Sequence, residues 1–168
     1  MPRIDLPDGK SDPEVRMWKL RPEMGIGAGA LSHAVYEQSI LPVRERELPR
    51  MRIAQINDCA ICQQWRKTEG TADALTEDDF ANVEAWRTYP GYSERERLAI
   101  EYAERFALAH REIDDAFFDR LHAVFTDAEI VELTAMIGNW LAFGRFQAVL
   151  DVAEACAWAP PADEKVGV

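Results

Sequence analysis

Residues 44–62, RERELPRMRIAQINDCAIC, join a charged, helix-forming run to two cysteines that lie three positions apart. The Asn57-Asp58 pair is typical of a turn and of a helix N-cap, so a helix is expected to begin at or beside Cys59. The free backbone N–H groups of a helix start, together with two cations seven and eight residues later, lower a thiol pKa from about 8.5 toward neutrality. The stretch therefore predicts thiol redox chemistry at Cys59 and Cys62, against the alternative that both are small buried hydrophobic residues.

Length, composition and charge limit the class of protein. A chain of 168 residues with 48% hydrophobic and 29% charged residues is expected to form one globular domain with a substantial core. Its net charge of −11 repels phosphate and disfavours nucleic-acid binding. The first residues lack the apolar run of a signal peptide, and three cysteines suggest no disulfide framework, so we expect a cytoplasmic location.

The hydrophobic pattern predicts an all-α chain, because no long segment alternates with a period of two. Residues 1–30 are rich in Pro and Gly and are expected to form an irregular N-terminal arm, followed by a helical domain over residues 31–157 and a C-terminal tail over residues 158–168. Within the domain, helices are expected over residues 31–40, 42–56, 59–67, 114–125 and 127–157. Pro49 lies inside the second of these helices and is expected to kink it or delay its regular part.

Three further helix starts are marked by capping-box patterns: Thr76-x-x-Asp79, Ser93-x-x-Glu96 and Thr126-x-x-Glu129. The acidic runs Glu77-Asp78-Asp79 and Asp114-Asp115 suit the first turns of helices, where the helix dipole stabilises negative charge. We therefore interpret these acidic residues as structural.

The last predicted helix is apolar on nearly all sides from Leu133 to Leu150. Such a helix must be covered on most of its surface. A membrane span is disfavoured because Asn139 and Arg145 lie near its middle. At about 1.5 Å per residue the helix is longer than a domain of this size is wide, so we expect it to bend or to form a subunit interface.

The cysteine stretch resembles the core motif of the alkylhydroperoxidase D-like group within the carboxymuconolactone decarboxylase family. That motif has a glutamate twelve residues before the first cysteine, the Cys-x-x-Cys pair, and a histidine four residues after the second cysteine. Glu47, Cys59 and Cys62 match in place. Residues 126–151 are also similar to the last helices of peroxidase-related members. The resemblance covers about residues 31–156, but its specific motif is confined to residues 47–66.

The resemblance implies an all-helical bundle that assembles into trimers or hexamers. It also implies reduction of peroxides or disulfides by the thiol pair, with Cys62 attacking and Cys59 resolving, and with electrons from an external thiol or, in some members, a lipoylated protein. No cofactor and no metal is implied. The alternative is a family member without redox activity, a helical oligomer that binds a small organic molecule or a protein partner.

One position departs from the motif, because Arg66 stands where the family has its proton-relaying histidine. Arginine is not deprotonated in proteins and cannot act as a general base. If the two helices form a hairpin, Glu47 and Arg66 lie nearly level, so we expect an ion pair between them beside Cys62. This pair is expected either to stabilise a thiolate or only to hold the helices in register.

Other residues are weaker candidates. His33, His110 and His122 are not spaced to a cysteine and are interpreted as structural. A zinc site is disfavoured, because a single Cys-x-x-Cys supplies only two of its four ligands. Cys156 is expected to pack in the core. Tyr36 and Trp65 are expected to line any pocket beside the thiols, or else to belong to the core.

Overall fold

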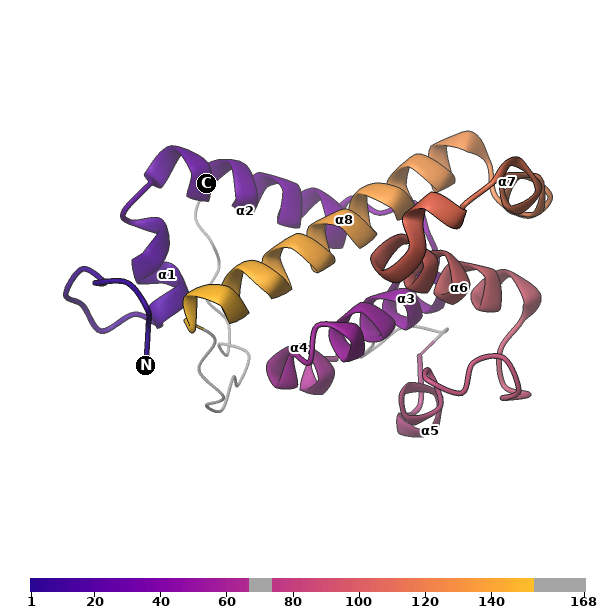
Figure 1. Cartoon of the computed structure of the whole chain (residues 1–168), viewed down its shortest axis with the longest axis horizontal. Helices are drawn as coiled ribbons and strands as arrows, with labels where there is room; N and C mark the ends of the chain where they lie inside the picture. The colour runs from indigo at the N-terminus through magenta and orange to yellow at the C-terminus, as the bar shows by residue number, and fades with distance from the viewer. Residues whose placement is uncertain (67–73, 153–168) are drawn as a thin grey trace.

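The computed structural model describes residues 1–66 and 74–152, and this part of the chain contains helices and no strand (Figure 1). The helices are α1 (Pro13–Trp18), α2 (Pro22–Glu37), α3 (Val43–Ile56), α4 (Ala60–Gln64), α5 (Glu77–Ala81), α6 (Glu94–Ala109), α7 (Asp115–His122) and α8 (Asp127–Leu150), with a short 3₁₀ turn over His110–Glu112. The predicted all-α class is confirmed for these residues.

Helix α3 is the centre of the fold and packs mainly against α6 and α8. In Figure 1 the long α8 crosses the molecule between α2 and α3. One apolar cluster gathers around Ile53 of α3 with Leu133 and Ile137 of α8, and a second gathers around Leu48 of α3 with Ile100 of α6. Because both faces of α3 are buried, the residues on it hold fixed positions.

The predicted helix starts are confirmed. Thr76, Ser93 and Thr126 each accept a hydrogen bond from the backbone N–H three residues on, and the acidic side chain at that position bonds back to the cap. Asp114 caps α7 through the N–H of Phe117. These contacts satisfy donors that a helix start leaves unpaired.

The N-terminal region differs from its prediction, because α1 and most of α2 lie in residues that were expected to be irregular. Pro13 and Pro22 stand in the first turns of these helices, where proline costs no hydrogen bond. Gly25 allows a close approach of α2 to α1, since a Cβ there would lie 2.9 Å from Trp18 Cβ. The predicted boundary between residues 30 and 31 therefore falls inside α2, which ends at Glu37 rather than at residue 40.

Three other helix predictions need correction. Helix α3 begins at Val43 and contains the buried Pro49, so this proline does not delay its regular part. Helix α4 ends at Gln64, before Lys67, which lies outside the described residues. Helix α8 ends at Leu150 because Asp151 adopts a left-handed conformation with φ 52°; residues 153–157 of its predicted range lie outside the described residues.

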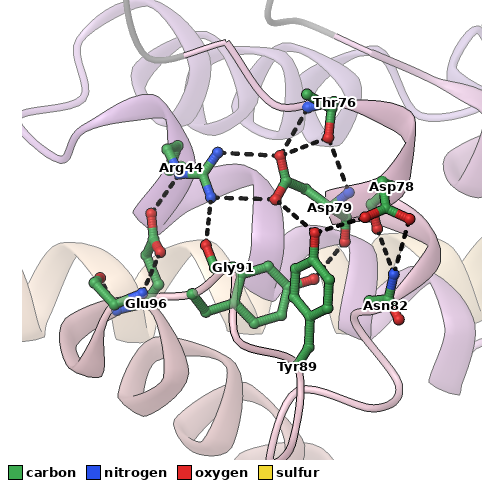
Figure 2. A network of polar contacts seen from close by, with 10 residues as sticks. Arg44, Thr76, Asp78, Asp79, Asn82, Tyr89, Gly91 and Glu96 are labelled. Atoms are coloured by element: carbon green, nitrogen blue, oxygen red, sulfur yellow. Dashed lines mark hydrogen bonds and ion pairs between the residues drawn. The ribbon is translucent and has the colours of Figure 1, made fainter.

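Arg44 joins the start of α3 to α5 and α6. Its guanidinium lies between two carboxylates, with Nε 2.5 Å from Glu96 Oε1 and Nη1 3.2 Å from Asp79 Oδ2 (Figure 2). It also donates to the carbonyl of Gly91, and Tyr89 donates its hydroxyl hydrogen to Asp78. This network holds α5 and the following loop on the outer side of α3.

None of the helices in the described ranges is both long and apolar enough to cross a lipid bilayer.

Candidate active site

The two cysteines lie where the chain turns from α3 into α4. Asn57 ends α3, and Asp58 reverses the chain with a left-handed φ of 51°. The N-cap of α4 is Cys59, not the Asn57-Asp58 pair, because Cys59 has the extended conformation of an N-cap and its sulfur accepts the hydrogen bond from the Cys62 N–H. A disulfide joins Cys59 to Cys62, their Cα atoms 5.3 Å apart, and the Cys62 N–H donates to Cys59 Sγ at 3.3 Å.

Glu47 lies on α3, the helix that precedes the two cysteines, and is completely buried. Its Oε2 lies 2.6 Å from Arg50 Nε and its Oε1 lies 3.3 Å from Arg46 Nε. Arg50 in turn donates to the carbonyl oxygens of Cys62, at 2.7 Å, and of Trp65, at 3.0 Å. Glu47 is thus linked to the end of α4 through Arg50.

The predicted ion pair between Glu47 and Arg66 is wrong. Because α4 ends at Gln64, Arg66 lies outside the helix and does not share a helix face with Cys62. It binds Glu77 through both carboxylate oxygens, at 2.9 and 3.0 Å, and lies over the ring of Phe80. The hydrogen bonds from Arg66 lower the pKa of the Glu77 carboxyl.

The partner of Glu47 is Arg50, which was not among the predicted site residues. Its spacing was a usable signal, since residues three apart are neighbours on one helix face. The place of Arg66 against α5 has no such local signal, because it depends on the tertiary structure.

A cavity of about 450 Å³ adjoins the disulfide. It lies between α1, α2, α3, α4 and α8, and its wall includes Cys62 but not Cys59. Tyr36 and Trp65 line it as predicted, with ring centroids 5.1 Å apart. The Trp140 Nε1–H donates to the Tyr36 hydroxyl oxygen at 3.0 Å, and burial raises the pKa of Tyr36.

The remaining candidates lie away from this cavity. His33, His110 and His122 are all exposed, and none is on the described part of the cavity wall. Cys156 lies outside the described residues. Within residues 1–66 and 74–152, no three His, Cys, Asp or Glu side chains are grouped so as to hold a metal ion. The acidic runs form the first turns of α5 and α7, as predicted.

Solved structures with the same fold include a protein from Agrobacterium tumefaciens proposed to be the antioxidant defence protein AhpD. It is 27% identical, matches 94% of this chain and all of its own, and superimposes with a TM-score of 0.73. A peroxidase-related protein from Ralstonia eutropha JMP134, described as an alkylhydroperoxidase AhpD core, has a TM-score of 0.65 at 19% identity over 83% of this chain and 75% of its own.

Among curated proteins, YnjA of Escherichia coli K12 is 36% identical over 107 residues, which are 64% of this chain. The match spans 59% of YnjA, less than two thirds of its length. YdfG of Bacillus subtilis 168 is 26% identical over 104 residues, 61% of this chain and 71% of its own.

The sequence pattern of the carboxymuconolactone decarboxylase family matches residues 22–105, half of the chain. The match contains α2, α3 and α4, and therefore Glu47 and both cysteines. Together with the AhpD-like arrangement of its helices, this match assigns the chain to the carboxymuconolactone decarboxylase family.

Proposed function

We propose that this protein is a thiol oxidoreductase that reduces peroxides or disulfides through Cys59 and Cys62. The observation that carries the proposal is the position of the disulfide, with Cys62 on the wall of a cavity large enough for a small substrate. Two solved structures with the same fold are described as an AhpD-type antioxidant protein and as a peroxidase-related protein, and these descriptions support the same class of activity.

In the proposed peroxidase reaction, the Cys62 thiolate attacks the terminal oxygen of a hydroperoxide ROOH. The O–O bond breaks, Cys62 becomes a sulfenic acid, and the alkoxide leaves as ROH after taking a proton. The Cys59 thiol then attacks the Cys62 sulfur, water leaves, and the disulfide forms. An external dithiol supplies two electrons and two protons to restore both thiols, becoming a disulfide itself.

The two cysteines have different roles in this scheme. Cys62 faces the cavity, so the reductant attacks its sulfur and Cys59 leaves as a thiolate. The hydrogen bond from the Cys62 N–H to Cys59 Sγ stabilises that thiolate and makes it a better leaving group. Glu47 acts at a distance, by orienting Arg50, which binds the carbonyl of Cys62. Arg66 is bound to Glu77 and takes no part.

We also propose that the protein works as a homo-oligomer, a trimer or hexamer, with an external thiol or a lipoylated protein as its electron donor. Apolar side chains on two helices support an assembly: Val149 of α8 is 61% exposed, and Ile26 of α2 is 74% exposed. The buried residues of α8 all lie between Ile130 and Trp140, whereas the residues from Leu141 to Leu150 are partly or fully exposed in the single subunit.

The alternative is a member without redox activity that binds a small organic molecule or a protein partner. Two observations favour it. Both oxygens of Glu47 are held by arginines, so it cannot serve as a free base, and the described cavity wall contains no histidine. The disulfide would then be structural.

The test is consumption of hydrogen peroxide and cumene hydroperoxide with dithiothreitol as reductant. We expect turnover by the native protein and by Cys156→Ser, and none by Cys62→Ser. Cys59→Ser, reduced and then freed of dithiothreitol, should consume one equivalent of peroxide and stop as a Cys62 sulfenic acid, which dimedone labelling and mass spectrometry detect. A native protein that consumes neither peroxide, together with a Cys59→Ser variant that dimedone does not label, would support the alternative.

A further inference from the structure

The cavity beside Cys62 has the size and the wall of a small-molecule site. Its volume of about 450 Å³ falls within the usual range of ligand pockets, about 300–1,000 Å³. Its wall on α8 extends from Asn139 to Gln147, which at 1.5 Å per residue is about 12 Å. This is long enough for a one- or two-ring molecule.

Aromatic rings make up much of this wall: Trp18, Tyr36, Trp65, Trp140 and Phe143. The rings hold one another in place. Trp18 meets Phe143 edge to face at 6.1 Å between centroids, and Tyr36 meets Trp65 in the same way at 5.1 Å. A flat apolar ligand therefore enters preformed surfaces, at a small cost in side-chain entropy.

One polar group on the wall lacks a partner. Asn139 is 6% exposed and lines the cavity, and its Oδ1 is buried without a hydrogen bond. Leaving a buried acceptor unpaired is unfavourable, and such groups are rare in folded proteins. Because this oxygen is itself buried, a turn of the Asn139 side chain brings it to the cavity, where one O–H or N–H group of a ligand satisfies it.

The charges on the wall favour a neutral ligand. Among the described residues that line the cavity, Arg50 is the one cation. Its guanidinium is already bonded to Glu47 and to the carbonyl oxygens of Cys62 and Trp65. Glu14 adds a carboxyl group to the same wall, and desolvation raises its pKa. An anion therefore finds no free positive group on this part of the wall.

We propose that this cavity binds a small neutral aromatic molecule with a single hydrogen-bond donor, of the indole or phenol type, its ring among the wall aromatics and its donor on Asn139 Oδ1. This goes beyond the proposed redox function, because the thiols take no part in binding. It is therefore measured on the oxidised, disulfide-bonded protein, and loss of peroxide turnover leaves the result unaffected.

The experiment is isothermal titration calorimetry of the oxidised full chain with indole, 1-methylindole and benzoate. We expect indole to bind with a Kd below about 1 mM. Because 1-methylindole keeps the ring and lacks the N–H, it should bind about tenfold more weakly. Benzoate should not bind. Failure of indole to bind, or equal binding of the two indoles, would overturn the proposal.

Variants identify the site. Asn139→Leu should bring the affinities for indole and 1-methylindole to the same value. Gly29→Leu should abolish binding, because Gly29 lines the cavity, a Cβ there meets no atom within 4 Å, and the larger side chain takes up space at the wall. Gly27→Leu is the matched control, since Gly27 lies on the same helix, is equally open and is off the wall. Native affinity in Gly29→Leu, or loss of binding in Gly27→Leu, would contradict the assignment.

Discussion

Glu47 is a buried carboxylate that two arginines of its own helix neutralise. Arg50 is 3% exposed and carries the shorter of the two ion pairs, while its remaining N–H groups reach the end of α4. Removing one partner of a buried pair leaves an uncompensated charge, which costs far more than the pair contributes when it is intact. Arg66, by contrast, is paired to a carboxylate that is 78% exposed.

Arg50→Met is expected to lower the free energy of unfolding by about 3–5 kcal/mol, because the fully buried Glu47 loses its closer cation. Arg66→Met is the matched control and should change it by less than about 1 kcal/mol, as for other exposed pairs. Urea unfolding followed by circular dichroism measures both variants. Similar losses in the two variants would contradict the greater importance of the buried Arg50–Glu47 pair.

At the scale of the elements, the thiol turn is anchored directly to α8. The Asn57 amide donates to the carbonyl oxygens of Trp140 and Leu141, at 3.2 and 3.4 Å, and accepts from Arg145 Nε at 3.2 Å. Gly144 makes room for this contact, since a Cβ there would lie 2.5 Å from Asn57 Nδ2. The end of α3 and the cavity wall on α8 are therefore held together.

Gly144→Ala is expected to destabilise the protein by about 1–3 kcal/mol, since Asn57 must move away from α8. Gly138→Ala lies on the same helix, and a Cβ there meets nothing within 4 Å, so it should stabilise the protein by about 0.5–1 kcal/mol through helix propensity. Thermal unfolding compares the two. A stabilised Gly144→Ala variant would show that the close contact with Asn57 is absent in solution.

At the scale of the whole molecule, ion pairs join neighbouring helices. Arg44 holds Asp79 across α3 and α5, Arg52 holds Glu104 across α3 and α6, and Arg120 holds Glu101 across α7 and α6. Burial raises the pKa of Asp79, but hydrogen bonds from Arg44 and Thr76 outweigh it and hold that pKa below its ordinary value of 3.8. The pKa values of Glu101 and Glu104 are lowered in the same way, by their arginines against burial.

These lowered pKa values determine how stability depends on pH. A carboxyl group with a lower pKa in the folded state stabilises the fold above its unfolded pKa, and this contribution is lost as the pH falls through the folded value. We therefore expect the free energy of unfolding to be level above about pH 5 and to fall below about pH 4.5. Urea unfolding between pH 3 and 7 measures it.

Asp79→Asn isolates one group of this set. The variant should be less stable than the native protein at pH 7 and should lose less stability on acidification. Asp119→Asn, at an exposed position of α7, is the control and should keep the native profile. An unchanged acid profile in Asp79→Asn would exclude the Arg44 network (Figure 2) as a source of acid sensitivity.

The proposed oligomeric state can be measured in solution. Light scattering at micromolar concentration should give the mass of a trimer or hexamer. Val149→Glu should shift it toward the monomer, because a charge then replaces an exposed apolar side chain of α8. Val15→Glu, on α1 and 49% exposed, tests whether any added charge has this effect. A monomeric native protein would contradict the proposal.

Several features followed from the sequence by itself, because they depend on atoms a few residues apart. The capping boxes at Thr76, Ser93 and Thr126 are of this kind, since a cap and its partner are three positions apart on one chain. The close approach of Cys59 and Cys62 within one turn is another. The all-α class could be predicted for the same reason, because helical hydrogen bonds are local.

The tertiary structure alone decided what depends on residues far apart in the chain. The Pro- and Gly-rich N-terminal region folds as α1 and α2 because Trp18 packs on Phe143 and Phe146 of α8, contacts that no local pattern encodes. Arg66 pairs with Glu77 rather than Glu47 because α4 stops early and α5 lies nearby. The cavity beside Cys62 exists only where five helices meet, so neither its aromatic wall nor the unpaired Asn139 was visible before the helices were placed.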